Sequence, residues 1–269
     1  MFAKFMRFIY YTAMFESNEI VLNELLIRYY RAQAPSCKSE APTLLFLHGW
    51  GSEGAVWRGV CEKLAHCGYH MYALDLSGFG ASETPKNPYS LDDYARSVFK
   101  FIQTLKLKKI ILVGHSFGGS VAIKLAATHP KIIQKLILVS SSGIRKMTAK
   151  KRAVGFIAKC VKPFFRSRYM QPFRKKLYIL IGAEDYTATP KLTETFRLIV
   201  NEDLALILPK ITQKTLIIWG DKDRATPLKD AYIFEHLIQN SALVVLKGAG
   251  HYSFLDKQDE WIEAVERFI

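Results

Sequence analysis

A serine between two glycines is the first candidate for chemistry. Gly-His-Ser-Phe-Gly at residues 114–118 lies between a predicted strand at 110–113 and a predicted helix that continues to His129. A nucleophilic serine has to project from a sharp strand-to-helix turn, and flanking glycines give that turn positions without a Cβ. The following helix N-terminus offers N–H groups and partial positive charge to a developing oxyanion. We therefore predict Ser116 as a nucleophile.

A histidine and an aspartate near the C-terminus complete the candidate catalytic set. His251 ends Gly-Ala-Gly-His and follows a predicted strand at 242–246, and reacting groups gather at the carboxyl ends of parallel strands. Two acids, Asp221 and Asp223, follow another predicted strand. We predict His251 as the general base and Asp223, in preference to Asp221, as the acid that orients it.

A glycine-rich loop after an earlier strand predicts the oxyanion site. His-Gly-Trp-Gly at 48–51 follows an apolar run at 43–47, and such a loop can turn a backbone N–H toward the substrate. We assign the oxyanion hole to the N–H groups of Trp50 and Phe117. His115 and Gly49, beside these groups, are predicted to contact the substrate. His48 is expected to be structural.

Strands alternate with helices along most of the chain, which predicts an α/β fold with a mostly parallel sheet. A turn at Asn23-Glu24 separates two expected strands at 20–30, and Ser90 reads as a helix N-cap. The expected strands are at 43–47, 70–74, 110–113, 135–140, 215–219 and 242–246, and the expected helices at 53–67, 90–105, 117–129, 229–239 and 256–268.

Residues 143–210 interrupt this alternation, and they carry most of the net charge of +14. Between residues 143 and 183 the chain has twelve Lys and Arg but no Asp or Glu. We predict core residues 1–142, a helical basic lid at 143–210, and core residues 211–269. The lid could attract an anionic substrate, an acidic carrier protein or an anionic membrane surface, or simply place its basic side chains in water.

Composition narrows the class of protein further. With 269 residues and 49% hydrophobic residues, the chain can bury one sizeable core. The four cysteines form no Cys-x-x-Cys pair, so we expect reduced thiols, a cytoplasmic protein and no bound metal. No apolar run has the length of a membrane span, and the basic, aromatic residues 1–15 lack a signal-peptide cleavage pattern. Nothing in the sequence indicates nucleic-acid binding.

These motifs together resemble the α/β-hydrolase superfamily over nearly the whole chain from about residue 20. The matching motifs are His-Gly-Trp-Gly, Asp75-Leu-Ser-Gly-Phe-Gly-Ala-Ser82, Gly-His-Ser-Phe-Gly-Gly, Trp-Gly-Asp-Lys-Asp and Gly-Ala-Gly-His. The resemblance implies an α/β-hydrolase fold with helices flanking the sheet and a helical lid insertion. It also implies a Ser-Asp-His triad, with the second Asp of Gly-x-x-Asp as its acid, which favours Asp223.

The expected activity is hydrolysis of a carboxylic ester through an acyl-enzyme on Ser116, without metal or organic cofactor. Two related activities stay open: hydrolysis of a carbon–carbon bond in a meta-cleavage-type substrate, and hydrolysis of an acyl-carrier-protein methyl ester. A third hypothesis is a non-enzymatic ligand receptor on a hydrolase scaffold. The serine argues against epoxide and haloalkane hydrolysis, for which relatives usually have aspartate at this position.

Overall fold

The computed structural model describes residues 15–33, 41–64, 68–145 and 190–269, and one sheet runs through them. Its strand order is β1-β2-β4-β3-β5-β6-β7-β8. The strands are β1 (Glu16–Leu22), β2 (Leu25–Gln33), β3 (Thr43–Leu47), β4 (His70–Leu74), β5 (Ile110–His115), β6 (Ile133–Val139), β7 (Lys214–Gly220) and β8 (Ser241–Leu246). β1 and β2, and β2 and β4, pair antiparallel, while all other neighbours are parallel. The mostly parallel sheet is therefore confirmed.

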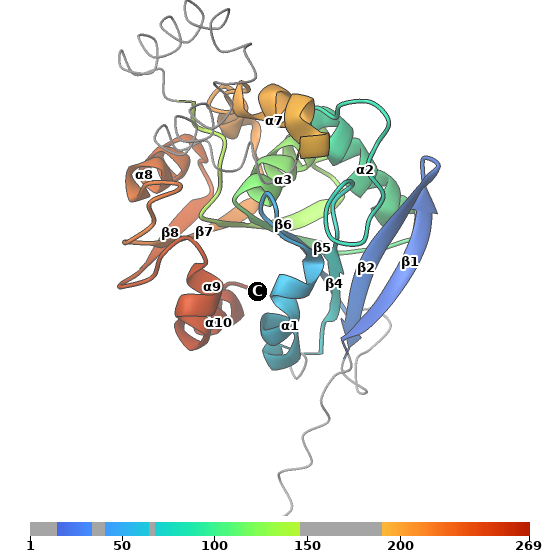
Figure 1. Cartoon of the computed structure of the whole chain (residues 1–269). Helices are drawn as coiled ribbons and strands as arrows, with labels where there is room; N and C mark the ends of the chain where they lie inside the picture. The colour runs from blue at the N-terminus through green and yellow to red at the C-terminus, as the bar shows by residue number, and fades with distance from the viewer. Residues whose placement is uncertain (1–14, 34–40, 65–67, 146–189) are drawn as a thin grey trace, which may run out of the picture.

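Helices cover both faces of the sheet (Figure 1). Helices α2, α3 and α8 lie on one face, and α1, α9 and α10 lie on the other. The helices are η1 (Gly54–Trp57), α1 (Arg58–Leu64), α2 (Leu91–Thr104), α3 (Phe117–Thr128), η5 (Pro190–Leu192), α7 (Thr193–Val200), η6 (Leu208–Lys210), α8 (Leu228–Leu237), α9 (Ser253–Asp256) and α10 (Gln258–Phe268). This arrangement is the predicted α/β fold.

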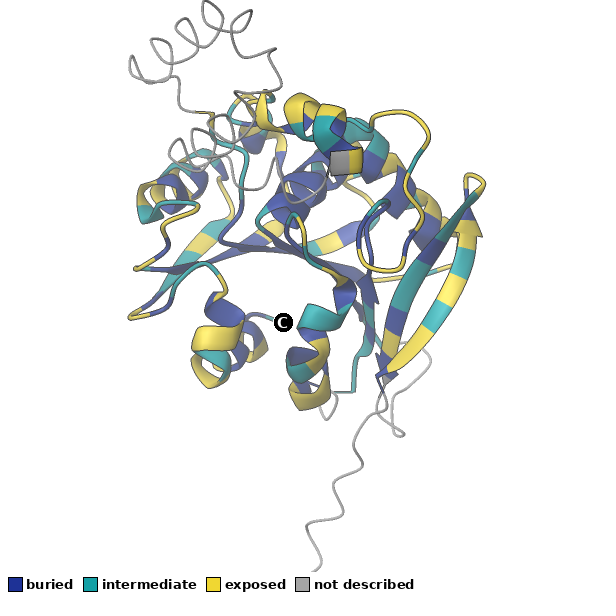
Figure 2. Cartoon of the chain, viewed as in Figure 1, coloured by how far each residue is buried: buried dark blue, intermediate teal, exposed yellow. Residues whose placement is uncertain are grey.

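The central strands β3 and β5 are apolar apart from Thr43 and His115 at their ends, because both of their faces are covered. Every residue of β3 and β5 is buried (Figure 2). Alternate side chains point to opposite faces, so Leu45 and Leu112 join the core beneath α2 and α3, whereas Phe46 and Val113 join the core beneath α1 and α10. A rigid sheet buried on both sides can hold the loops at its carboxyl ends in fixed positions.

Local sequence signals account for most element boundaries. Asn23 and Glu24 have φ values of 50° and 64°, as the tight turn of a hairpin requires. Ser90 caps α2 and forms a reciprocal capping box with Asp93. The helix expected at 256–268 is present as α10, and Lys257, with a non-helical φ of −136°, separates it from the short helix α9, which was not expected.

The described part of the predicted lid packs on the core. Leu204 and Leu208 are fully buried, and the Leu204 N–H donates to the Gly143 carbonyl at 2.8 Å. Lys124 of α3 forms ion pairs with Glu202 and with Asp92 of α2. The rest of the lid prediction, residues 146–189, lies outside the described residues, so the lid and its boundaries stay predictions.

The described residues include no helix that is both long and apolar enough to span a membrane. Among them Cys61 is a buried free thiol, and the other three cysteines lie outside the described ranges.

Candidate active site

Ser116 occupies a strained turn between β5 and α3. Its φ of 51° and ψ of −114° lie outside the regions that L-residues favour, at a typical cost of about 1–3 kcal/mol. Neighbouring glycines make the turn possible. A Cβ on Gly114 would lie 2.5 Å from the Gly118 carbonyl oxygen, and a Cβ on Gly118 would lie 2.5 Å from the Leu47 carbonyl oxygen. The Ser116 N–H donates to the Val139 carbonyl of β6 at 3.0 Å, which fixes the turn to the sheet.

The structure brings His251 and Asp223 into direct contact. His251 Nδ1 and Asp223 Oδ2 are 2.8 Å apart, so the ring donates to the carboxylate and directs Nε2 away from it. Both Asp223 oxygens have further donors. The N–H groups of Ala225 and Thr226 donate to Oδ1, and the Thr226 hydroxyl donates to Oδ2 at 2.8 Å. The carboxylate is thus held in one orientation against the imidazole.

These donors determine the charge state of Asp223. Burial by itself raises the pKa of this carboxyl, because it disfavours the ionised form. The hydrogen bond and positive charge of His251, with the Thr226 donors, outweigh burial and lower the pKa below its ordinary value. Asp223 is therefore ionised at neutral pH and can stabilise a positive charge on His251.

The loop that carries His251 is fixed by contacts with two other acids. The Gly248 N–H donates to Asp221 Oδ1, and the Gly250 N–H donates to Asp256 Oδ2, each at 2.7 Å. The Lys222 N–H also donates to the Ala249 carbonyl at 2.9 Å. Asp221 thus stabilises the backbone of the loop, whereas Asp223 forms the hydrogen bond with the imidazole of His251.

His115 packs against His251, with ring centroids 4.7 Å apart. Its side chain is fully buried, and its Nε2–H donates to the His251 carbonyl at 3.0 Å. The ring packs against Tyr252 and Phe254, with centroids 4.8 and 5.2 Å away. Burial lowers the pKa of His115 to about 3, so the ring is neutral. Its predicted contact with substrate stays a prediction.

His48 and Asp75 hold neighbouring loops together. His48 Nδ1 donates to the Gly49 carbonyl at 2.7 Å, and Nε2 accepts from the Leu76 N–H at 3.0 Å. Burial lowers the pKa of His48 to about 4. Asp75 accepts from the N–H groups of Gly54 and Ala81. Both residues organise backbone, as was expected for His48.

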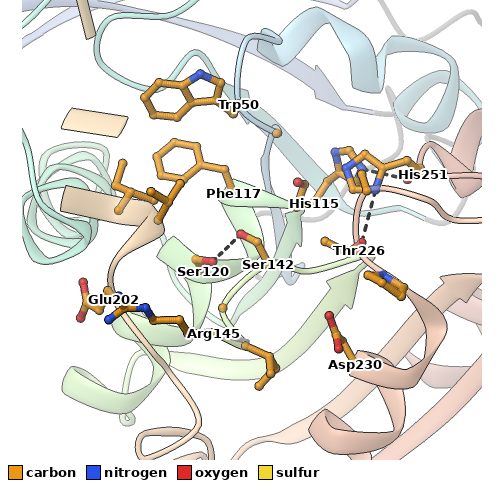
Figure 3. A pocket seen from close by; sticks show the side chains of 18 of the residues that line it. Trp50, His115, Phe117, Ser120, Ser142, Arg145, Glu202, Thr226, Asp230 and His251 are labelled. Carbon is orange, nitrogen blue, oxygen red and sulfur yellow. Dashed lines mark hydrogen bonds between the residues drawn. The ribbon is translucent and has the colours of Figure 1, made fainter. Parts of the chain in front are cut away.

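A cavity of about 640 Å³ opens at the carboxyl edge of the sheet (Figure 3). Ser116, His251, His115 and Gly49 line it, and Asp223 lies behind His251. Figure 3 shows Trp50 and Phe117 side by side, with His251 on the opposite side of the space. The predicted nucleophile and base therefore line the same cavity as an aromatic wall formed by Trp50 and Phe117.

The predicted oxyanion donors lie on two different elements beside Ser116. Phe117 is the first residue of α3, where helix N–H groups lack intrahelical acceptors. Trp50 follows β3, and the indole packs on Phe117 and on Phe196 of α7, with centroids 5.4 and 5.0 Å away. A Cβ on Gly49 would lie 2.9 Å from His115 Nδ1 and 3.3 Å from the Ser116 Cβ, so a glycine lets this loop approach the turn closely.

The sequence did not indicate several of the residues that line or support the cavity. Thr226 contacts Asp223, and it is itself fixed by the Trp219 indole N–H, which donates to its carbonyl at 2.7 Å. The hydroxyls of Ser120 and Ser142 lie 2.7 Å apart and also line the space (Figure 3). Ser120 lies one helical turn after Ser116, a spacing that could have indicated it. For Thr226 the sequence offered only a weak indication, namely an aspartate three residues before a threonine in a turn.

The described residues contain no cluster of His, Cys, Asp and Glu arranged to hold a metal.

Comparison with known proteins identifies the family. The family described as alpha/beta hydrolase fold matches residues 42–198 and 151–258, and this chain belongs to it. A pimeloyl-[acyl-carrier protein] methyl ester esterase from Aliivibrio fischeri is 26% identical, covering 86% of this chain and 95% of that protein.

Solved structures agree on the fold. The esterase from Exiguobacterium antarcticum has a TM-score of 0.73 and 24% identity, covering 94% of this chain and 99% of that one. A meta-cleavage product hydrolase from Pseudomonas fluorescens has a TM-score of 0.70 and 22% identity, covering 93% and 96%. At these identities the likeness establishes the α/β-hydrolase fold.

Proposed function

We propose that this protein hydrolyses a carboxylic ester through an acyl-enzyme on Ser116. The observation that carries the proposal is that Ser116, Asp223 and His251, which are far apart in the sequence, lie together at the carboxyl edge of the sheet. Asp223 holds His251 at 2.8 Å, and His251 and Ser116 line the same cavity. A buried, ionised aspartate bonded to a histidine that lines the same cavity as a strained serine fits the arrangement that nucleophilic acyl transfer requires.

The proposed reaction has two halves. His251 Nε2 takes the Ser116 proton as Oγ bonds to the ester carbon, and the resulting oxyanion is stabilised by the Trp50 and Phe117 N–H groups. Collapse of this intermediate breaks the bond to the alcohol, which leaves with the proton from His251. Water, deprotonated by the same histidine, then attacks the acyl-enzyme and releases the acid.

Hydrolysis of p-nitrophenyl esters with increasing acyl length tests the activity. We expect wild-type turnover on at least one ester, and loss of roughly a thousandfold or more in kcat in Ser116→Ala. The matched control is Ser142→Ala, which removes a hydroxyl from the same cavity but leaves the predicted triad intact. Absence of turnover on every ester would contradict the proposal, as would full activity in Ser116→Ala.

The relative from Aliivibrio fischeri supports a narrower version, in which the ester is carried by an acidic carrier protein. The basic residues of 143–183 have the complementary charge. Turnover of a carrier-bound ester should then fall steeply between about 50 and 200 mM salt, while turnover of a small neutral ester should change little. Equal salt dependence for both substrates would argue against the carrier.

Carbon–carbon bond hydrolysis is the second candidate, and the polar end of the cavity favours it. Ser120, Ser142 and Arg145 line the cavity together with the carboxylates of Glu202 and Asp230 (Figure 3), and the two hydroxyls and the guanidinium could bind a substrate carboxylate. Cleavage of a vinylogous diketone acid in preference to all p-nitrophenyl esters would select this activity over ester hydrolysis.

A further inference from the structure

Thr226 lies where the loop after β7, which carries Asp223, meets the loop after β6. It is partly buried and lines the same cavity as Ser116. The indole N–H of Trp219, a residue of β7, donates to the Thr226 carbonyl at 2.7 Å. The backbone of Thr226 is thus attached to the sheet, and the fold defines where its hydroxyl lies.

The Thr226 hydroxyl contacts both the proposed acid and the proposed base. It donates to Asp223 Oδ2 at 2.8 Å, and the same oxygen accepts from the imidazole of His251. Thr226 Oγ1 also lies 3.4 Å from His251 Nδ1, and Figure 3 shows this contact. One hydroxyl is therefore within reach of the carboxylate and of the ring, and it limits the directions in which either group can rotate.

The same hydroxyl also reaches the loop that follows β6. Thr226 Oγ1 lies 3.0 Å from the Ser140 carbonyl oxygen, and because a hydroxyl has one proton, this oxygen shares it with Asp223 Oδ2. Ser140 is fully buried and has a φ of 44°, in the left-handed region that a serine rarely adopts. A strained residue keeps its conformation only where its contacts determine it, and the Thr226 hydroxyl is one of these contacts.

The residues on either side of Ser140 hold the turn of the proposed nucleophile. The Ser116 N–H donates to the Val139 carbonyl, and the Ser142 N–H donates to the Ser116 carbonyl, each at 3.0 Å. The backbone of Ser116 is therefore fixed by this loop on both sides of its Cα. Through the Ser140 carbonyl, the Thr226 hydroxyl connects the loop that holds the nucleophile to the acid and the base.

We propose that Thr226 is a positioning residue, which keeps Asp223 and His251 aligned with Ser116. The proposal rests on the ester hydrolysis proposed above. Without the hydroxyl, the loop of the acid and the loop of the nucleophile lose a common hydrogen-bonding group, and a displacement of about 1 Å can lower a reaction rate roughly a hundredfold. Because Thr226 acts through the acid and the base, its loss should lower kcat and leave KM nearly unchanged.

Steady-state kinetics on the best p-nitrophenyl ester tests the role of the hydroxyl. Thr226→Val removes it but retains the N–H that donates to Asp223 Oδ1, and kcat should fall roughly ten- to hundredfold with KM changed by less than about twofold. Thr226→Ser retains the hydroxyl and should keep kcat within about threefold of the wild type. The control Thr215→Val removes a buried hydroxyl at the amino end of β7, which donates to the Gln213 carbonyl, and should change neither constant.

Proton NMR of the His251 Nδ1–H tests the positioning without turnover. This hydrogen-bonded proton resonates far downfield, and its absence in His251→Ala assigns the signal. The resonance should shift in Thr226→Val and keep its wild-type position in Thr226→Ser and in Thr215→Val.

A wild-type resonance in Thr226→Val, or an equal loss of kcat in Thr226→Val and Thr226→Ser, would overturn the proposal. If the wild type hydrolysed no ester, the proposed function would fail, and the resonance would still decide the role of Thr226. Thermal midpoints verify that the variants fold, and Thr226→Ala, which also removes the hydroxyl, replaces Thr226→Val if the valine lowers the midpoint.

Discussion

At the scale of single residues, two aspartates only two positions apart have different contacts. Asp221 accepts from the Gly248 N–H and braces the loop, while Asp223 reaches His251. The sequence was sufficient to prefer Asp223, because the resemblance placed the acid at the end of Gly-x-x-Asp. It could not reveal how Thr226 supports that acid, since the support depends on a turn whose geometry emerges only in the fold.

His115 gives a prediction that separates positioning from substrate binding. Its hydrogen bond to the His251 carbonyl fixes the loop that carries the proposed base. Replacing it with phenylalanine removes this donor, and kcat for ester hydrolysis should fall roughly ten- to hundredfold with little change in KM. Steady-state kinetics of the purified variant would measure both constants.

Two comparisons make the His115 test specific. His115→Gln retains a donor near the position of Nε2 and should recover part of the lost kcat. His236→Phe changes a histidine at an exposed position of α8 and should have no effect. A large rise in KM with unchanged kcat would instead favour the substrate contact predicted from the sequence.

At the scale of elements, the positions of strands and helices followed largely from local patterns. β3 and β4 have the predicted limits because each is a short apolar run between loops. α7 was expected only as part of a helical insertion, and the short helix α9, which precedes α10, was not expected. Both depend on packing against the core, which a local pattern does not contain.

The N-cap of α2 provides a test at this scale. Ser90 accepts from the Asp93 N–H and completes a capping box, so Ser90→Ala should lower the free energy of unfolding by about 1 kcal/mol. Urea unfolding followed by circular dichroism would measure the change. Thr104→Ala, at the exposed end of the same helix, should change stability by less than about 0.5 kcal/mol. Equal effects of the two substitutions would contradict the capping role.

At the scale of the whole molecule, buried histidines tie stability to pH. His48 and His115 have folded pKa values of about 4 and about 3, below the ordinary value of 6.5. The unfolded chain therefore binds more protons than the folded chain between pH 6.5 and about 4. The neutral rings make their full contribution to the free energy of unfolding above pH 6.5. This contribution is lost as the pH falls below 6.5.

The size of this effect can be measured. Each histidine should account for about 2 kcal/mol of lost unfolding free energy between pH 7.5 and 5, since one pH unit corresponds to about 1.4 kcal/mol per proton. Asp75 opposes the loss in part, because burial raises the pKa of its carboxyl. Urea unfolding at several pH values should show a clear fall in midpoint over this range. A midpoint that stays constant from pH 7.5 to 5 would contradict the buried neutral histidines.

The overall architecture was more predictable than its long-range contacts. Alternating strands and helices implied the parallel sheet, and sheet topology then brought residues 116, 223 and 251 to one edge. The ion pairs of Lys124 with Glu202 and Asp92 join three segments distant in sequence, and no local pattern indicates them. Substrate preference likewise depends on the combined shape of a cavity that draws on many elements.

The most direct test of the central claim is covalent labelling with a fluorophosphonate, followed by peptide mapping. The account predicts a single adduct on Ser116 in the wild type, none in Ser116→Ala, and labelling slowed by more than about a hundredfold in His251→Ala. An adduct on a different residue, or a Ser116→Ala variant labelled as fast as the wild type, would show that Ser116 is not the nucleophile.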